Sequence, residues 1–410
     1  LDLYILNVTM RSDGSSRFAP SDRYGYFPSV SLGWNVSKES FWKFPQTDLK
    51  FRLSYGKTGN QDGIGNYAWQ PLMSGGINYG NNSGMAVTSM GNNKLTWETA
   101  DQYDFGFDLG FWNGKLNMIA DIYLKNTNNL LYSMPLHGTS GFTSITSNIG
   151  SMRNYGVEFS INGHLNIGKV NWTSSFNISH NKNKLTKLLG DDLLPIGSNR
   201  ALKVGEELGA FYLFQMDGLY QYDGEVPQPL YDLGVRAGDV KYHDADNNGI
   251  INDNDRVLTG SSNPDFFGGW NNTFKYKGFQ LDVFFTYMYG NDVYAEWAVT
   301  ATRPGYRMAI TEDVAKNRWT APGSSDKYPR AVNTLCGHNS KNSTRFLEDG
   351  SFIRLRSLTF SYTFPQVMLQ KICLKGLRLY VQGDNLLLFS KYSGWDPEVS
   401  KNMDPQYFGV

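Results

Sequence analysis

The chain has 410 residues and a formal net charge of zero, with 38 basic and 38 acidic side chains. Because a phosphate-binding surface needs a basic excess, this balance argues against nucleic acid as the main partner. Mean hydropathy is −0.42, and the sequence contains no run of about 18 apolar residues that could form a transmembrane helix. A membrane-spanning β-barrel is not excluded, since its strands are apolar on one face only.

Aromatic residues make up 15% of the chain and 43 residues are glycine, a composition typical of β-structure with many turns. The two cysteines, Cys336 and Cys373, are too few for a disulfide framework. The sequence starts inside an apparent strand, without an initiator methionine or a signal peptide. We therefore expect it to be part of a longer chain.

About eleven segments alternate apolar and polar side chains with the period of a half-buried strand. In residues 102–111, for example, Tyr103 and Phe105 share one face, and Asp104 and Asp108 share the other. A soluble sandwich also alternates in this way, so the pattern alone indicates only β-structure. In chain order, the expected strands lie near residues 1–12, 24–38, 48–58, 99–111, 115–130, 152–167, 170–183, 264–276, 278–290, 350–364 and 376–389.

The connections between these strands alternate between short and long. The short ones are residues 39–47, 112–114, 167–169, 276–278 and 365–375. The long ones are residues 13–23, 59–98, 131–151, 184–263, 291–349 and 390–410. Outer-membrane barrels have short periplasmic turns and long extracellular loops. The sequence therefore favours an all-β fold, a transmembrane antiparallel β-barrel, over a soluble sandwich or a β-propeller.

The alternation of short and long connections also predicts the direction in which each strand runs. The first strand and the strand at 376–389 should both run outward, whereas the last strand of a barrel returns to the periplasm, so we expect a closing strand beyond Val410. Cys336 and Cys373 would then lie at opposite rims, where no intramolecular disulfide can form. In residues 350–364 the apolar positions change phase, which predicts a β-bulge near Ser357.

Short motifs lie along the whole chain, at residues 11–18, 27–34, 53–61, 95–98, 154–158, 238–242, 349–358, 384–386 and 392–398. In order and spacing they resemble the SusC/RagA family of TonB-dependent outer-membrane transporters. The motif positions that we single out are Arg11, Asp13, Gly14, Ser15, Arg17, Phe18, Gly56, Gly59, Asn60, Asn154, Gly156, Glu158, Asn385, Asp396, Pro397 and Glu398.

The resemblance implies a barrel of about 22 strands with an N-terminal plug. Residues 1–410 would be its C-terminal part, with the plug, the upstream strands and the closing strand outside this sequence. The family also implies a Gram-negative outer membrane of the Bacteroidetes type and contact with its lipid. It further implies a SusD-like surface lipoprotein as partner, and import of oligosaccharides or peptides powered by the TonB complex through the N-terminal part.

Residues 244–255 match the spacing of a calcium-binding loop. Its oxygen ligands would come from Asp244, Asp246, Asn248, Ile250, Asn252 and Asp255. The sequence departs from the EF-hand in two ways: no helices are expected on either side, and Asp255 replaces the usual bidentate glutamate. A surface loop built from Asx turns is the alternative. If calcium binds, its role would be to stiffen the long connection 184–263.

Other polar clusters have a structural and a functional interpretation. Arg11, Asp13, Arg17 and Arg23 would contact anionic cargo or lipopolysaccharide, or form salt bridges that hold a loop, and we favour salt bridges. Asp396 and Glu398 suggest a catalytic pair, but the intervening Pro397 favours a structural turn at the rim.

Several aromatic residues of the long connections could stack on sugar rings, although loop packing is the simpler interpretation for each one. They are Tyr67, Trp69, Tyr79, Tyr220, Tyr222, Tyr231, Trp297, Tyr306 and Trp319. The sequence contains no nucleophile elbow, P-loop, zinc-protease motif or Cys-x-x-Cys, so we do not expect an enzyme. The functional alternatives to an active transporter are a passive porin-like channel and a soluble or surface-attached carbohydrate-binding β-protein.

Overall fold

The computed structural model describes residues 3–190, 193–305, 309–332, 337–370 and 374–398. One antiparallel sheet of eleven strands dominates it, and each strand pairs with its neighbours in chain order. All eleven expected strands are confirmed. They are β1 (Tyr4–Gly14), β2 (Tyr24–Asn35), β3 (Thr47–Asn60), β6 (Glu98–Phe111), β7 (Leu116–Asn128), β10 (Gly150–Ile167), β11 (Val170–Leu188), β18 (Phe266–Tyr276), β19 (Phe279–Tyr289), β22 (Phe352–Thr363) and β23 (Arg378–Ser390).

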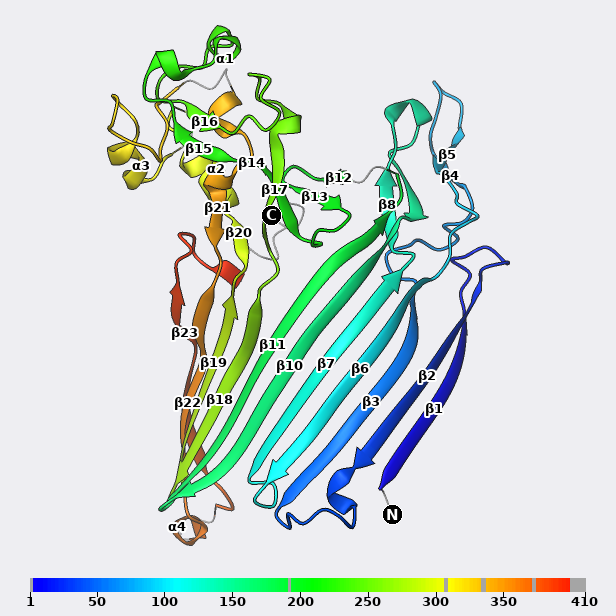
Figure 1. The fold of residues 1–410 in the computed structure, drawn as a ribbon, viewed down its shortest axis with the longest axis vertical. Coiled ribbons are helices and arrows are strands. Elements are labelled where there is room, and N and C mark those ends of the chain that lie inside the picture. The colour runs from blue at the N-terminus through cyan, green and yellow to red at the C-terminus, as the bar shows by residue number, and fades with distance from the viewer. Residues whose placement is uncertain (1–2, 191–192, 306–308, 333–336, 371–373, 399–410) are drawn as a thin grey trace.

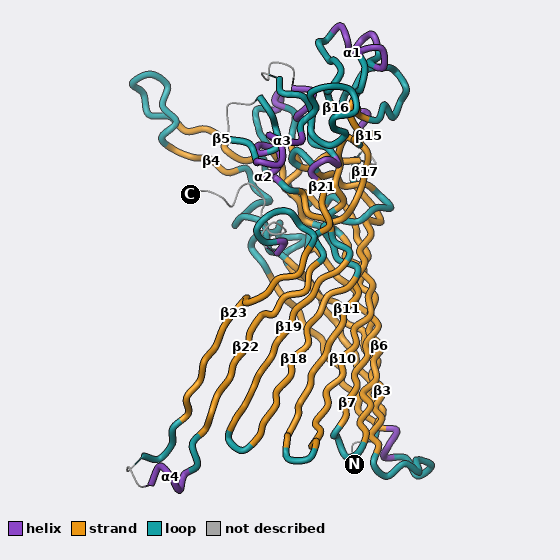
Figure 2. The backbone as a smooth tube through the Cα atoms, turned by 90° about the vertical axis from the view of Figure 1, so that its left-hand side faces the viewer, coloured by secondary structure: helices purple, strands orange, loops and turns teal. Residues whose placement is uncertain are grey.

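The sheet is curved (Figures 1 and 2), and the side chains on its two faces differ in chemistry. Leu53, Phe105 and Ile122 are Cα partners across β3, β6 and β7, and all three are exposed. The adjacent positions along the same strands point to the opposite face of the sheet, and they include Arg52 and Asp121. We call the face of Leu53 the outer face and the face of Arg52 the inner face. An apolar face without a protein partner is what a barrel wall presents to lipid.

At the lower end of the sheet in Figure 1, the turns between β6 and β7, β10 and β11, and β18 and β19 are tight, as expected, with two to four residues each. Tyr276 pairs with Phe279, which leaves only Lys277 and Gly278 in the turn. Both have positive φ, at 45° and 90°. Two such residues form the type I′ turn whose twist matches that of paired strands. All the long connections leave the opposite end (Figure 1).

The predicted bulge in β22 is confirmed one residue from the expected place. Arg356 is the extra residue, because Leu355 and Ser357 pair with consecutive residues of β19, Phe285 and Phe284. The register also shifts between Leu355 and Ser357 on the β23 side. An extra residue reverses the in–out phase of a strand, which explains why the apolar positions change phase in the sequence.

The structure also contains short elements that the sequence did not predict, most of them in the long connections. The strands are β4 (Leu72–Gly75), β5 (Met85–Ser89), β8 (Leu131–Pro135), β9 (Ser144–Asn148), β12 (Leu193–Ile196), β13 (Arg200–Lys203), β14 (Ala210–Phe214), β15 (Met216–Leu219), β16 (Val240–Tyr242), β17 (Arg256–Ser261), β20 (Asp292–Tyr294) and β21 (Leu347–Asp349). The α-helices are α1 (Gln228–Asp232), α2 (Glu296–Ala301), α3 (Glu312–Asn317) and α4 (Gln366–Gln370).

Single turns of 3₁₀ helix complete the list: η1 (Val36–Lys38), η2 (Gly138–Ser140), η3 (Asp223–Glu225), η4 (Asp253–Asp255), η5 (Gly337–Ser340) and η6 (Thr344–Phe346). Within the described residues, every helix is too short and too polar to cross a membrane. Cys336 and Cys373 lie outside the described residues, so the expectation that they form no disulfide is not tested.

Candidate functional site at the loop end of the sheet

The two longest connections fold together above one side of the sheet (Figure 1). We call residues 193–261, together with the described residues of 292–349, the loop body. One of its apolar cores contains Val240, Tyr242 and Leu230, with Trp319 of the second connection packed against them. The other joins Phe211 and Leu213 of the first connection to Val293, Tyr294, Ala295, Ala298 and Phe346 of the second, and to Tyr392. The loop body is therefore an internally packed unit made from both connections.

Asp239 holds the two connections together. Its side chain is only 1% exposed. One carboxylate oxygen accepts from Arg330 Nε at 2.8 Å and from Asn339 Nδ2 at 2.8 Å. The other accepts from Arg330 Nη2 at 2.9 Å and from the backbone N–H of Arg236 at 2.9 Å. A buried carboxylate with this many donors is satisfied in every direction, so it fixes η5 and residue 330 against β16.

His338 adds further contacts between the two connections beside Asp239, and we call this contact region of η5, residue 330 and β16 the joint. His338 Nε2 lies 2.7 Å from the backbone oxygen of Val240, and the Tyr242 hydroxyl donates to the backbone oxygen of His338 at 2.9 Å. Burial lowers the pKa of His338, because a low-dielectric surrounding disfavours the charged imidazolium. His338 is therefore neutral at neutral pH and donates a single ring N–H into the joint.

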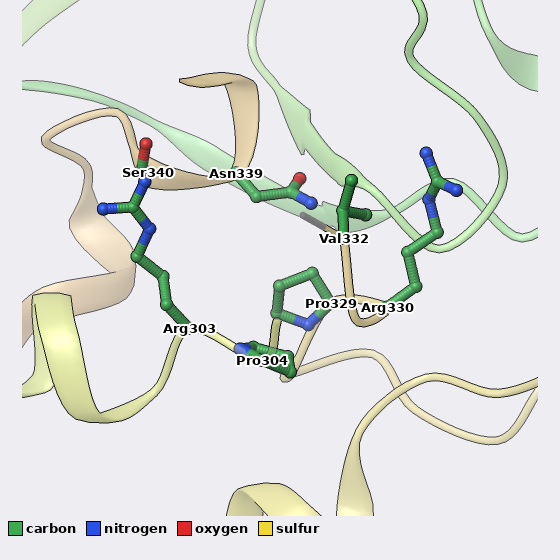
Figure 3. A pocket seen from close by; sticks show the side chains of 7 residues that line it. All are labelled: Arg303, Pro304, Pro329, Arg330, Val332, Asn339 and Ser340. Carbon is green, nitrogen blue, oxygen red and sulfur yellow. The ribbon is translucent and has the colours of Figure 1, made fainter. Parts of the chain in front are cut away.

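A small pocket lies beside this joint (Figure 3). Its lining residues are Arg303, Pro304, Pro329, Arg330, Val332, Asn339 and Ser340. Its volume of about 20 Å³ holds about one water molecule. In Figure 3 the side chains of Arg303 and Arg330 lie on opposite sides of the two prolines. The pocket is too small for a sugar ring or a dipeptide.

The proposed calcium loop brings three of its expected ligands together. Carboxylate oxygens of Asp244, Asp246 and Asp255 lie within 4.8 Å of one another. Asp244 accepts the backbone N–H of Gly249 at 2.7 Å, and this hydrogen bond is the main reason why the pKa of Asp244 lies below its ordinary value. The charged form that a cation needs is thus already favoured.

The remaining positions are less well arranged for a cation. The side-chain oxygen of Asn248 accepts the backbone N–H of Ile250 at 2.8 Å, and that of Asn252 accepts the N–H of Asn254 at 2.9 Å. These are the Asx-type contacts of the alternative interpretation. As expected, strands rather than α-helices flank the loop: β16 precedes it, and β17 follows η4. The donor set fits calcium in its carboxylates and needs rearrangement at its two amides.

Three motifs far apart in the sequence meet, together with Ile64, in a first rim cluster above β2, β3 and β6. Its members are the buried residues Phe18, Phe27, Ile64, Leu95 and Trp97. Gly59 is required beneath it, because a Cβ atom there would lie 2.1 Å from Phe27 Cζ. Trp97 Nε1 also donates to the backbone oxygen of Arg23 at 3.2 Å. These motif residues build the extracellular end of the wall.

The polar residues of the first motif hold the same rim. Arg11 Nε lies 2.8 Å from Asp13 Oδ2, which confirms the salt-bridge interpretation for this pair. Arg17 Nη1 donates to the backbone oxygen of Gln61 at 2.9 Å, and Ser15 Oγ accepts the N–H of Arg17 at 3.2 Å. A Cβ atom at Gly14 would lie 2.7 Å from the Tyr24 ring.

The other single motif positions have varied roles. Asn60 Nδ2 donates to Glu98 Oε1 at 3.1 Å, which ties β3 to β6. Gly56 makes only an ordinary contact, with Ser29, so the structure gives no steric reason for it. Asn154 and Glu158 project from the inner face of β10, in phase with Asp121.

A second rim cluster joins the last three motifs. Arg354 is 5% exposed, and its guanidinium lies 2.6 Å from Asp396 and 3.0 Å from Glu398. Arg356, the bulge residue, reaches Glu398 at 3.0 Å and Asn385 Oδ1 at 3.2 Å. Two carboxylates neutralised by arginines are a structural arrangement rather than a catalytic pair, as the intervening Pro397 suggested.

An ion cluster on the inner face was missed by the sequence reasoning. Arg52 Nη2 lies 3.0 Å from Asp108 Oδ1 and 2.9 Å from Asp121 Oδ1. Asp121 belongs to the second strand from Arg52, and Gly106 lies between them as the Cα partner of both. A Cβ atom at Gly106 would lie 2.0 Å from Asp121 Oδ1. The signal that could have revealed the cluster is charge in the inner phase of three successive strands.

The aromatic residues of the long connections divide into buried and exposed groups. Tyr220 lies in the loop-body core, and Tyr231 and Trp319 pack against it. The exposed ones are Tyr67, Tyr79, Tyr222 and Trp297. Tyr306 lies outside the described residues. Trp69 is half-buried. Loop packing therefore accounts for the first group, and the exposed group is free to stack on a ligand.

Residues 1–386 match the family model described as TonB dependent receptor-like, β-barrel. TonB-dependent receptor P3 of Formosa agariphila is 35% identical over 98% of the chain. TonB-dependent receptor SusC of Bacteroides thetaiotaomicron is 31% identical over 98% of it. The chain spans 41% of the length of either relative. The solved RagAB peptide transporter is similar with a TM-score of 0.85 and 27% identity, over 97% of the chain and 43% of that protein.

Proposed function

Because the chain belongs to the TonB-dependent receptor-like β-barrel family of the outer membrane, we propose that it works in energised import. The cargo is an oligosaccharide or a peptide, and a SusD-like surface lipoprotein assists its capture. The matched family consists of receptors and transporters rather than enzymes.

The observation that carries this proposal is that the two faces of the sheet differ in polarity, below a packed loop body. The outer face is apolar and exposed, whereas the inner face carries ion clusters such as that of Arg52. A polar lumen accepts a hydrated cargo. The loop body lies at the extracellular end, where cargo arrives first. The similarity to SusC and to the RagAB peptide transporter supports the proposal. The latter is named for a peptide cargo, and the family resemblance of the sequence adds oligosaccharide as the second candidate cargo.

Uptake measurements separate active import from a passive channel. Cells that express the receptor are given a fluorescent oligosaccharide pool or a fluorescent peptide pool, with and without a protonophore. Import through a TonB-coupled receptor stops when the proton-motive force collapses. Uptake that continues at the same rate under the protonophore would identify the porin-like alternative.

The lipoprotein partner is tested by affinity purification. The receptor carries a tag, and the outer membrane is solubilised in mild detergent without crosslinking. We expect a lipid-anchored protein in stoichiometric amount in the purified complex. A receptor that purifies alone, yet still shows energised uptake, would remove the lipoprotein from the proposal and retain the import activity.

We also propose that residues 244–255 bind calcium and thereby stiffen the connection that carries them. The convergence of Asp244, Asp246 and Asp255 supports this role. Asp255 also accepts the backbone N–H groups of Ala245 at 2.9 Å and of Asn252 at 2.7 Å, so a cation at this position would hold both ends of the loop. Calcium would supply only a rigid oxygen-coordinated centre.

A further inference from the structure

Three basic residues project from the outer face at the extracellular ends of β10 and β11. They are Arg153, Lys184 and Lys187, and all three are exposed. Arg153 and Lys184 are direct Cα partners across the two strands, and Lys187 pairs with Ser151. We call these three residues the outer basic patch.

The register shows that this patch continues the lipid-facing surface. Arg153 follows Val157 and Tyr155 at successive two-residue steps on β10, and both of these apolar side chains are exposed on the outer face. Tyr155 lies directly below the patch, and Tyr103 lies two strands away in the same row. Tyrosines in this position mark the boundary between the hydrocarbon core and the headgroups. The patch therefore lies at headgroup level.

The described part of the chain offers these cations no acidic partner within ion-pair distance. Like charges directly opposite each other across two strands repel. Among the described residues, no ion pair involves any of the three. The neighbouring Lys182 differs, because Glu207 at 3.2 Å and Asp265 at 2.8 Å engage it. Asp101, in the same row as Arg153, accepts a hydrogen bond from the Tyr55 hydroxyl. Glu206, whose backbone oxygen accepts the N–H of Leu185, forms no ion pair among the described residues.

The geometry of Arg153 suits a phosphate. Its Nε donates to Asn126 Oδ1 at 2.9 Å, which fixes the plane of the guanidinium on the outer face. A guanidinium with a fixed plane can bind phosphate oxygens through its terminal N–H groups, and lysines beside it add charge.

We propose that the outer basic patch binds the phosphate of an outer-leaflet glycolipid headgroup. Its position favours a lipid over free phosphate, because the patch continues the face that contacts the acyl chains, so a single lipid molecule can occupy both surfaces. This inference rests on the outer-membrane location and is independent of the cargo and of the lipoprotein partner.

The test uses the purified receptor in phosphatidylcholine nanodiscs, with phosphorylated lipid A as the probe and native mass spectrometry as the readout. A variant carrying R153Q, K184Q and K187Q should bind the probe about tenfold more weakly. The matched control carries K115Q, K169Q and K277Q, which removes the same charge from exposed lysines at the turns of the opposite end. This control should bind like the unchanged receptor.

Two further arms distinguish the source of the phosphate. Dephosphorylated lipid A should bind the unchanged receptor as weakly as the phosphorylated probe binds the patch variant. Inorganic phosphate at millimolar concentration should not displace the probe. Equal binding of the two lipids, equal loss in the control, or displacement by inorganic phosphate would each overturn the proposal. Thermal unfolding of all variants in detergent verifies that the barrels are folded.

Discussion

At the scale of single residues, Asp239 shows what a motif can mean. The sequence places it in a short family motif without a role, whereas the structure shows a buried carboxylate that receives Arg330 and Asn339 from the other long connection. No periodicity could have indicated this, because the partners lie 91 and 100 residues away, one outside any element and one in a single turn of 3₁₀ helix. A buried acid becomes informative only when its donors are located.

We predict that Asp239→Asn loosens the loop body without unfolding the barrel. The substitution leaves Arg330 without its counter-charge, which costs about 3 kcal/mol locally. Hydrogen exchange of residues 236–242 and 337–340 should become faster, while the strands remain protected. Asp326→Asn is the control, because Asp326 is an exposed acid of the same connection as Arg330 that forms no hydrogen bond or ion pair among the described residues, and an exposed acid of this kind contributes little. Unchanged exchange in Asp239→Asn would contradict the role.

The acidic loop shows how far spacing alone can predict a site. The spacing correctly predicted that Asp244, Asp246 and Asp255 lie close together. It could not predict that the side chains of Asn248 and Asn252 would bind backbone N–H groups instead. A calcium-bound loop would need these two amide oxygens released from the backbone, and the spacing alone does not reveal that requirement.

Calcium removal should therefore expose residues 244–255 to protease. Chelation should raise cleavage there several-fold, and calcium should reverse the effect. Asp244→Ala combined with Asp246→Ala should be cleaved rapidly with or without calcium. Asp253→Ala is the matched control, because Asp253 belongs to the same loop but pairs with Arg256. A cleavage rate that changes neither on chelation nor in the double variant would favour the Asx-turn alternative.

The same loop has a predictable pH dependence. The folded loop lowers the pKa of Asp244 below its ordinary value of 3.8. A depressed pKa contributes stability above the unfolded value, and this contribution is lost as the pH falls through the folded value. In the absence of calcium, protease resistance of the loop should thus be constant from pH 7 to pH 5 and fall below about pH 4. A decrease between pH 7 and pH 5 would contradict this assignment.

At the scale of elements, the long strands were predictable and the short ones were not. A strand of eleven or more residues, such as β3 or β10, repeats the period of two often enough to be recognised. The hairpin of β4 and β5 has strands of four and five residues, so its period cannot be separated from chance. The bulge at Arg356 was visible because it shifted a long pattern by one residue.

Close packing between strands gives the sharpest element-scale prediction. Gly156 lies between β7 and β11, and the Tyr123 hydroxyl reaches across it to donate to Asn181 Oδ1 at 3.0 Å. A Cβ atom at Gly156 would lie 2.4 Å from the backbone oxygen of His180 and 2.6 Å from the Tyr123 hydroxyl. Backbone cannot move aside as a flexible side chain can.

Gly156→Ala should therefore destabilise the barrel by about 1–3 kcal/mol. The measurement is the temperature at which the folded, fast-migrating form on a gel converts to the unfolded form. Gly163→Ala in the same strand is the control, because its nearest neighbour would be Leu116 Cδ1 at an ordinary 3.8 Å. Equal shifts in the two variants would attribute the effect to strand propensity rather than to the close approach.

At the scale of the whole molecule, the alternation of short and long connections was enough to predict most of the architecture. Short turns can only join adjacent antiparallel strands, so they fix one end of the sheet, and the long connections must leave the other. This alternation could not predict that two of these connections pack into one loop body. That packing depends on side chains such as Phe211 and Trp319, which come together only in three dimensions.

The orientation of the molecule can be tested in intact cells. In a background with Cys336→Ser and Cys373→Ser, a cysteine is introduced at Tyr79, which is 90% exposed in a long connection, or at Lys169 in a tight turn. A membrane-impermeant maleimide should label the first variant in intact cells. It should label the second only after the outer membrane is permeabilised, because the tight turns face the periplasm. The reverse pattern would invert the molecule in the membrane and move the loop body, the calcium loop and the outer basic patch to the periplasmic side.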